Sequence, residues 1–136
     1  MAHHRLTRIM MVEDEPDIRT VAKIALEAVG GYTVELCASG NEALAKAPEF
    51  APDLLLLDVM MPGMDGPTTY EALRAIPQTA DTPVIFMTAK VQRHEVAHYK
   101  QLGAIEVIAK PFDPMTLSAT IHDIWEQTND ESSHLF

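Results

Sequence analysis

The sequence predicts an α/β fold, in which a doubly wound, five-stranded parallel sheet of strand order 2-1-3-4-5 is covered by five helices. Short apolar runs alternate with amphipathic helical patterns along the chain, as is typical of parallel strands joined by right-handed helical crossovers. The run LLLLD at 54–58 is apolar up to its last residue, as expected of a strand that helices cover on both faces. Asp58 should therefore lie at the carboxyl end of the sheet, where open α/β sheets bind ligands.

Five segments have the composition of strands. They span residues 8–12, 32–38, 54–58, 84–87 and 105–109. Four of these strands lead into polar side chains: Glu13 and Asp14 after the first, Asp58 at the end of the third, Thr88 after the fourth and Lys110 after the fifth. Because the carboxyl ends of parallel strands meet at one edge, all five side chains are expected there.

The first helix is expected over 17–29, where apolar residues repeat on one face and Gly30 and Gly31 then end the helix. The positions on that face are Ile18, Val21, Ala22, Ala25, Leu26 and Val29. The spacing therefore predicts that these six side chains face the core.

A capping box formed by Ser39 and Glu42 predicts a second helix that runs through Ala47. Pro48 and Pro52 are expected in the loop that follows. Three further helices are expected over 67–76, 92–102 and 114–127, and the last of them should be capped by Asp113.

A chain of 136 residues has the size of one domain. We expect this domain to cover 6–127, between a flexible N-terminus at 1–5 and a flexible tail at 128–136. Cys37 is the only cysteine, which excludes an intrachain disulfide and favours a buried thiol in a reducing compartment. No apolar run approaches the roughly 20 residues that span a bilayer, so the expected location is cytoplasmic. The net charge of −10 disfavours direct contact with nucleic acid.

The residues at this edge predict phosphoryl transfer to a carboxylate. Glu13, Asp14 and Asp58 should repel one another unless a cation is bound, and oxygen ligands at an open edge suit Mg²⁺ or Mn²⁺. The Lys110 ammonium and the Thr88 hydroxyl can donate to phosphoryl oxygens. Asp58 is expected to be the acceptor, because it lies between the acidic pair and these two donors.

The blocks VEDEPDIR, LLLLDVMMPGMDG, PVIFMTAK and AKPF resemble, in order and spacing, the receiver domain of two-component response regulators, chemotaxis-regulator type. The resemblance covers about 6–127 and implies a flavodoxin-like fold. It also implies that Asp58 is the phosphoacceptor, that Glu13, Asp14 and the backbone carbonyl of Met60 bind the metal, and that Thr88 and Lys110 contact the phosphoryl group. The Lys110–Pro111 bond is expected to be cis.

The same resemblance implies a role in phosphorelay signalling rather than enzymatic turnover of another substrate. The expected donor is a sensor histidine kinase or a histidine phosphotransfer protein. No output domain follows residue 127 in this sequence, so we expect a stand-alone domain, monomeric or weakly dimeric, that signals by contact with a downstream protein.

One departure leaves an alternative open. The family commonly has an aromatic residue three positions before the lysine, where this chain has Val107. A receiver-like interaction module that takes no phosphate is therefore the second hypothesis. A phosphatase of the haloacid-dehalogenase type is disfavoured, because it would need an aspartate where this chain has Met60, and a flavin-binding protein is disfavoured by the acidic loop EDEPD.

Overall fold

The computed structural model describes residues 4–134 and contains one parallel sheet of strand order β2-β1-β3-β4-β5. The strands are β1 (Arg8–Val12), β2 (Thr33–Cys37), β3 (Leu54–Asp58), β4 (Val84–Thr88) and β5 (Glu106–Ala109). The helices are α1 (Pro16–Lys23), the π-helix η1 (Ile24–Val29), α2 (Gly40–Phe50), α3 (Gly66–Arg74), the 3₁₀ turn η2 (Pro77–Thr79), α4 (Arg93–Leu102) and α5 (Leu117–His134). The predicted fold class and strand order are confirmed.

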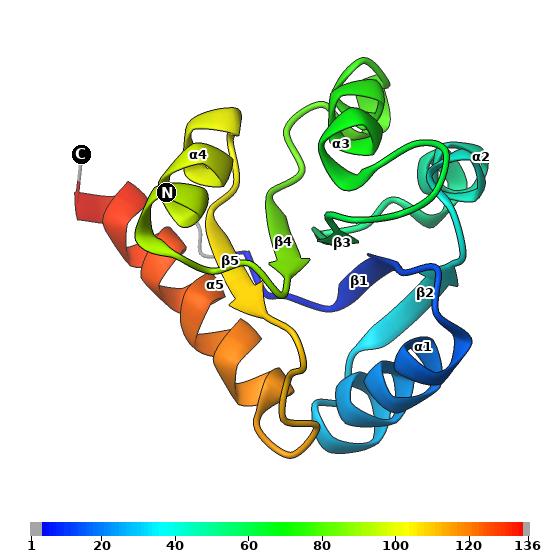
Figure 1. The fold of residues 1–136 in the computed structure, drawn as a ribbon. Helices are drawn as coiled ribbons and strands as arrows, with labels where there is room; N and C mark the ends of the chain where they lie inside the picture. Colours follow the sequence, from blue (N-terminus) through cyan, green and yellow to red (C-terminus); the bar gives the residue numbers. More distant parts are fainter. Residues whose placement is uncertain (1–3, 135–136) are drawn as a thin grey trace.

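Helices cover both faces of the sheet (Figure 1). Successive residues of a strand point to opposite faces. In β3, Leu54 and Leu56 accordingly pack with α1, η1 and α5, whereas Leu55 and Leu57 pack with α2 and α3. Each face therefore has its own apolar core, which explains why four consecutive leucines are all fully buried.

The first helix differs from its prediction in its second half. Ala22, Ala25 and Leu26 are buried as predicted, but Val29 is 54% exposed and Val21 is also partly exposed. The exposure of Val29 follows from the π-helix, whose wider turns rotate its last residue away from the face that a 3.6-residue period defines. Val21 lies before the π-helix, in α1, so its exposure has no such cause.

The second helix is longer than predicted, because it continues through Pro48 to Phe50. The Phe50 side chain packs against the core, and its carbonyl accepts a hydrogen bond of 2.8 Å from Nε of Arg8. These contacts hold the last turn of α2 in place, and Ala51 then ends the helix in the left-handed conformation. Ser39 caps the helix as predicted, accepting from the backbone N–H of Glu42.

The structure describes part of each terminal segment. Residues 1–3 and 135–136 lie outside the described part, but His4 contacts Asp53 at 2.8 Å and its carbonyl accepts from the Trp125 indole at 2.8 Å. Helix α5 continues past residue 127 to His134, because no glycine or proline interrupts the sequence there. The structure thus describes residues 4–5 and 128–134 of the two terminal segments, and their flexibility stays a prediction.

The predicted burial of the Cys37 thiol is confirmed. The Cys37 thiol is fully buried, and burial raises its pKa to about 12. The predicted start of the last helix is wrong, because α5 begins at Leu117 and Asp113 instead accepts from the backbone N–H of Met115 in the turn before it. No helix within residues 4–134 has the length and apolar character needed to cross a bilayer.

Candidate phosphoacceptor site

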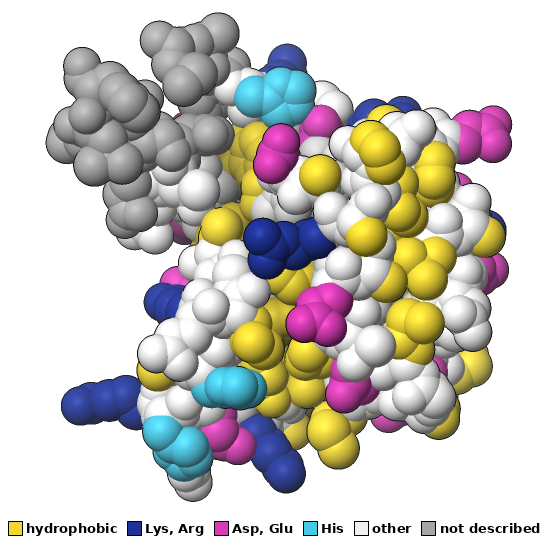
Figure 2. All heavy atoms as spheres, turned by 90° about the horizontal axis from the view of Figure 1, so that it is seen from above, with side chains coloured by type: hydrophobic (Ala, Val, Ile, Leu, Met, Phe, Trp, Pro, Cys, Tyr) yellow, Lys and Arg dark blue, Asp and Glu magenta, His cyan; other side chains and the backbone are white. Residues whose placement is uncertain are grey.

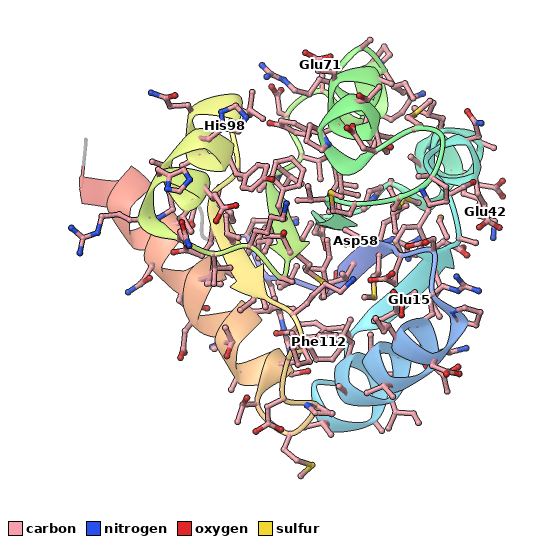
Figure 3. The ribbon with its side chains drawn as sticks, viewed as in Figure 1. Glu15, Glu42, Asp58, Glu71, His98 and Phe112 are labelled. Carbon is pink, nitrogen blue, oxygen red and sulfur yellow. The ribbon has the colours of Figure 1, made fainter. Side chains whose placement is uncertain are left out.

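The predicted site residues lie at the carboxyl ends of the strands. Asp58 is the last residue of β3 and is only 3% exposed. Glu15 and Phe112 lie on neighbouring loops, on the same side of Asp58 as helix α1 (Figure 3). Because the strand before it is buried on both faces, the Asp58 carboxylate has a fixed position.

Lys110 joins the loop after β5 to the ends of β1 and β3. Its Nζ lies 2.8 Å from Oε1 of Glu13 and 3.1 Å from Oδ1 of Asp58. The Lys110 side chain is 15% exposed, and the two carboxylates are more deeply buried. In this structure one ammonium thus partly neutralises two buried carboxylates.

Burial raises the pKa of both carboxylates. The pKa of Glu13 is raised to about 7, chiefly by burial and further by the charge of Asp58, although Lys110 opposes the shift. Burial likewise raises the pKa of Asp58 despite the nearby ammonium. For Lys110, burial lowers the pKa, but the bonds to Glu13 and Asp58 outweigh it and the net pKa is raised. The site therefore needs more positive charge than Lys110 supplies.

A divalent cation fits this need. Carboxylate oxygens of Glu13, Asp14 and Asp58 all lie within 4.8 Å of one another, and Asp14 is partly open to solvent. When all three carboxylates are ionised, they and the Lys110 ammonium leave a net charge of about −2, which one Mg²⁺ or Mn²⁺ balances. An all-oxygen set with room for water suits these ions.

The structure gives less direct support for the predicted roles of Thr88 and Met60. Thr88 ends β4, one residue after Met87, the partner of Asp58 in the sheet. Its buried hydroxyl accepts from the backbone N–H of Lys90 at 3.1 Å. Met60 lies in the loop two residues after Asp58, with 67% of its surface exposed. The roles of the Thr88 hydroxyl and the Met60 carbonyl stay predictions.

Two residues that the sequence analysis missed shape this site. Nη1 of Arg19, one turn into α1, donates to the carbonyl of Glu13 at 2.7 Å and so fixes the backbone of the acidic loop. Gly66 begins α3, and a β-carbon there would lie 2.9 Å from Cα of Val59 and closer still to the carbonyl oxygen of Asp58. Gly66 could have been found from the sequence, as the glycine that follows MMPGMD. The role of Arg19 depends on tertiary geometry.

The segment HEVAH in α4, His94 to His98, has the form of a zinc-protease helix. Its histidines are exposed, and exposed histidines are visible on the face seen from above (Figure 2). The Glu95 carboxylate is already bonded to the backbone N–H of Gln92. Within the described residues, Glu13, Asp14 and Asp58 are the one group of three or more potential ligands, and His98 lies far from them (Figure 3). The pattern therefore does not mark a zinc site.

Comparison with known proteins agrees with this geometry. A family model described as the response regulator receiver domain matches residues 9–122. The transcriptional regulator RpaA of Synechocystis sp. is 34% identical over 91% of this chain, and ResD of Bacillus subtilis is 39% identical over 79% of it. The chain spans about half the length of these relatives, 51% and 43% respectively. Among solved structures, the chemotaxis protein CheY4 of Vibrio cholerae is 33% identical, with a TM-score of 0.80 over 88% of this chain and 99% of that one.

Proposed function

The chain belongs to the family of response regulator receiver domains of two-component signalling, and from this premise we propose that Asp58 accepts a phosphoryl group in a Mg²⁺-dependent reaction. The donor is the phosphohistidine of a sensor histidine kinase or of a histidine phosphotransfer protein. The observation that carries the proposal is the position of Lys110, whose ammonium contacts both Asp58 and the acidic residue Glu13.

In the proposed transfer, a carboxylate oxygen of Asp58 attacks the phosphorus atom of the phosphohistidine. An O–P bond forms while the P–N bond breaks, and the electron pair of that bond returns to the imidazole nitrogen. Lys110 can turn from the carboxylates toward the new phosphoryl oxygens, and the Thr88 hydroxyl can donate to another of them. A divalent cation held by Glu13, Asp14 and Asp58 would offset the negative charge of the incoming group.

The product is an acyl phosphate, which water hydrolyses to the free Asp58 carboxylate and inorganic phosphate. The chain thus assists its own phosphorylation and dephosphorylation but turns over no other substrate. The negative net charge of −10 disfavours contact with a phosphate backbone. The proposed signal therefore passes by contact with a downstream protein. The relative RpaA is a DNA-binding regulator, but we propose no DNA binding for this chain.

Phosphorylation can be tested directly with a small acyl phosphate such as acetyl phosphate. Incubation with Mg²⁺ should add the mass of one phosphoryl group to the intact chain, and Asp58→Asn should abolish the addition. Glu15→Gln is a matched control, because Glu15 is an exposed acid of the same loop whose carboxylate is outside the metal cluster. A mass gain that survives Asp58→Asn, or that EDTA leaves unchanged, would refute the proposal.

The same experiment distinguishes the alternative function. An interaction module that takes no phosphate would show no mass gain in the wild-type chain at any Mg²⁺ concentration. The buried contact between Lys110 and Asp58 argues against this alternative, because burying a lysine among carboxylates is costly when it serves stability alone.

A further inference from the structure

Helix α4 has the weakest attachment to the core of the helices on its side of the sheet. None of its residues is buried, whereas α2 and α3 each bury several. The residue of α4 that packs against the core on this face is Tyr99, which is partly buried. Tyr99 is therefore the main apolar contact of α4 with this core.

Tyr99 packs on the central residue of β4. Its ring centroid lies 5.5 Å from that of Phe86, in an edge-on arrangement, and Tyr70 of α3 approaches Phe86 from another side at 6.0 Å. The sheet partner of Phe86 on β5 is Val107. Because valine is small and fixed in its rotamer, the ring that contacts Phe86 near β5 comes from α4 rather than from the strand.

This aromatic contact is close to the proposed phosphoryl site along the chain. Phe86 and Thr88 lie two residues apart in β4, so their side chains point to the same face of the sheet. Burial raises the pKa of Tyr99, and the nearby carboxylates of Glu95 and Asp65 raise it further. Asp65 caps α3 in the loop that follows Asp58. Tyr99 thus packs on the middle of β4, two residues before Thr88, and is close enough to Asp65 for that carboxylate to affect its pKa.

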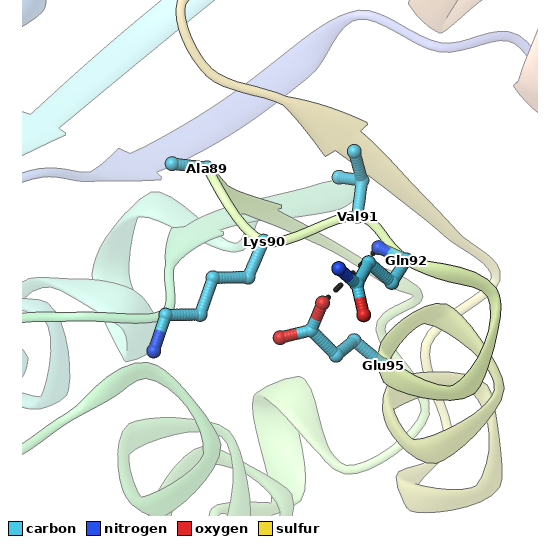
Figure 4. A pocket seen from close by; sticks show the side chains of 5 residues that line it. All are labelled: Ala89, Lys90, Val91, Gln92 and Glu95. Atoms are coloured by element: carbon cyan, nitrogen blue, oxygen red, sulfur yellow. Dashed lines mark hydrogen bonds between the residues drawn. The ribbon is translucent and has the colours of Figure 1, made fainter.

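The segment between Thr88 and α4 has space in which to rearrange. An open hollow of about 450 Å³ is lined by Ala89, Lys90, Val91, Gln92 and Glu95 (Figure 4). The backbone N–H of Lys90 currently donates to the Thr88 hydroxyl. If that hydroxyl turns toward a phosphoryl oxygen, its bond geometry with Lys90 changes, and the segment can move into the hollow.

We propose that Tyr99 is the positioning residue that couples the state of Asp58 to the position of α4, by holding the helix against Phe86 while the segment 89–92 rearranges. This inference rests on the proposed function, since it requires a phosphoryl group at Asp58. The ring of Tyr99 acts as the fixed point about which α4 shifts. Without the ring, α4 separates from β4 and no longer senses Thr88.

Amide hydrogen exchange of α4 tests this coupling. In the wild-type chain with Mg²⁺, adding beryllium trifluoride as a phosphoryl mimic should change exchange in residues 93–102 by about fivefold or more. Tyr99→Ala and Tyr99→Leu should both lose this response, whereas Tyr99→Phe, which keeps the ring, should retain it. An undiminished response in both ringless variants would overturn the inference.

Ile76→Ala is the matched control for a merely structural effect. Ile76 is also a partly buried residue that packs on the same core, but it follows α3 rather than belonging to α4. This variant should lose stability yet keep the response of α4, and loss of the response there would overturn a specific role for Tyr99.

The mass test with acetyl phosphate separates the two proposals. A Tyr99→Leu variant that gains one phosphoryl group while its α4 stays unresponsive supports the inference. A wild-type chain that gains no phosphoryl group refutes the proposed function and this inference with it. A phosphorylated wild-type chain whose α4 exchange does not change refutes the inference alone.

Discussion

Nζ of Lys110 lies 3.1 Å from Oδ1 of Asp58, although the two residues are 52 positions apart in the sequence. The lysine follows the edge strand β5, and the aspartate ends the central strand β3. The same Nζ also contacts Glu13, so one cation bridges the ends of three strands. Such an arrangement suits the binding of an incoming phosphoryl group. It also makes the stability of the unphosphorylated domain dependent on Lys110.

Replacing Lys110 should therefore destabilise the fold. Lys110→Met leaves Glu13 and Asp58 buried without their cation, and removing one partner of a buried ion pair costs about 3–5 kcal/mol. Urea unfolding without divalent metal should show this loss. Lys46→Met is the control, because Lys46 also contacts two carboxylates, those of Glu35 and Glu42, but its side chain is 41% exposed. Equal effects of the two substitutions would contradict the role of burial.

The sequence predicts this site well because its residues are tied to strand ends. Glu13, Asp58 and Lys110 each follow an apolar strand, and parallel topology alone brings such ends together. What the sequence does not reveal is the contact of Arg19 with the Glu13 carbonyl, which depends on how α1 packs. The same limit applies to the aromatic contact of Tyr99, since a lone tyrosine in a polar helix gives no signal of its partner.

The errors in the predicted fold also come from structure that local sequence patterns do not reveal. The periodic face of the first helix assumes 3.6 residues per turn, and the π-helix after Lys23 breaks that assumption. Pro48 is a helix-ending signal by local propensity, but the packing of Phe50 and its bond with Arg8 prevail over it. Local patterns thus locate the elements, whereas tertiary contacts decide where they end.

Mg²⁺ should stabilise the wild-type domain. An ion that binds the native acidic cluster and not the unfolded chain adds about 2.7 kcal/mol at 100 times its dissociation constant. Asp14→Asn should remove most of this gain, because Asp14 is the most accessible of the three carboxylates. Thermal unfolding over a Mg²⁺ series checks this, with Glu15→Gln expected to respond as the wild type does. A wild-type melting temperature that does not depend on Mg²⁺ would contradict the metal site.

Gly66→Ala should damage both stability and phosphorylation. The added methyl group would clash with the backbone of Asp58 and Val59. Overpacking of this kind lowers the free energy of unfolding by about 1–3 kcal/mol. Because this backbone carries Asp58, the proposed phosphoacceptor, transfer from acetyl phosphate should also slow. Gly63→Asn in the same loop is the control: Gly63 has a φ of +76° with nothing near its β-position, and asparagine tolerates that conformation. Normal phosphorylation of Gly66→Ala would show that the loop is not held against Asp58.

Asp53 should stabilise the junction of the N-terminal segment with β3. Its Oδ2 accepts from the backbone N–H groups of Thr7 and Arg8, and its Oδ1 lies 2.8 Å from Nε2 of His4. Burial alone would raise the pKa of Asp53, but these hydrogen bonds outweigh it and hold the pKa below its ordinary value of 3.8. A lowered pKa in the folded state means that the ionised carboxylate favours folding.

The contribution of Asp53 is therefore fully present above pH 3.8, the ordinary carboxylate value, and is lost as the pH falls through the lower value of the folded state. At neutral pH, Asp53→Asn should cost about 1–2 kcal/mol, since it weakens hydrogen bonds to a charged acceptor. Urea unfolding of both proteins over a descending pH series should show the difference narrowing below pH 3.8. Asp81→Asn, at an exposed position, should show no such difference at any pH. If the difference in free energy of unfolding between wild type and Asp53→Asn instead widens with acid, the ionised carboxylate opposes folding and this prediction is wrong.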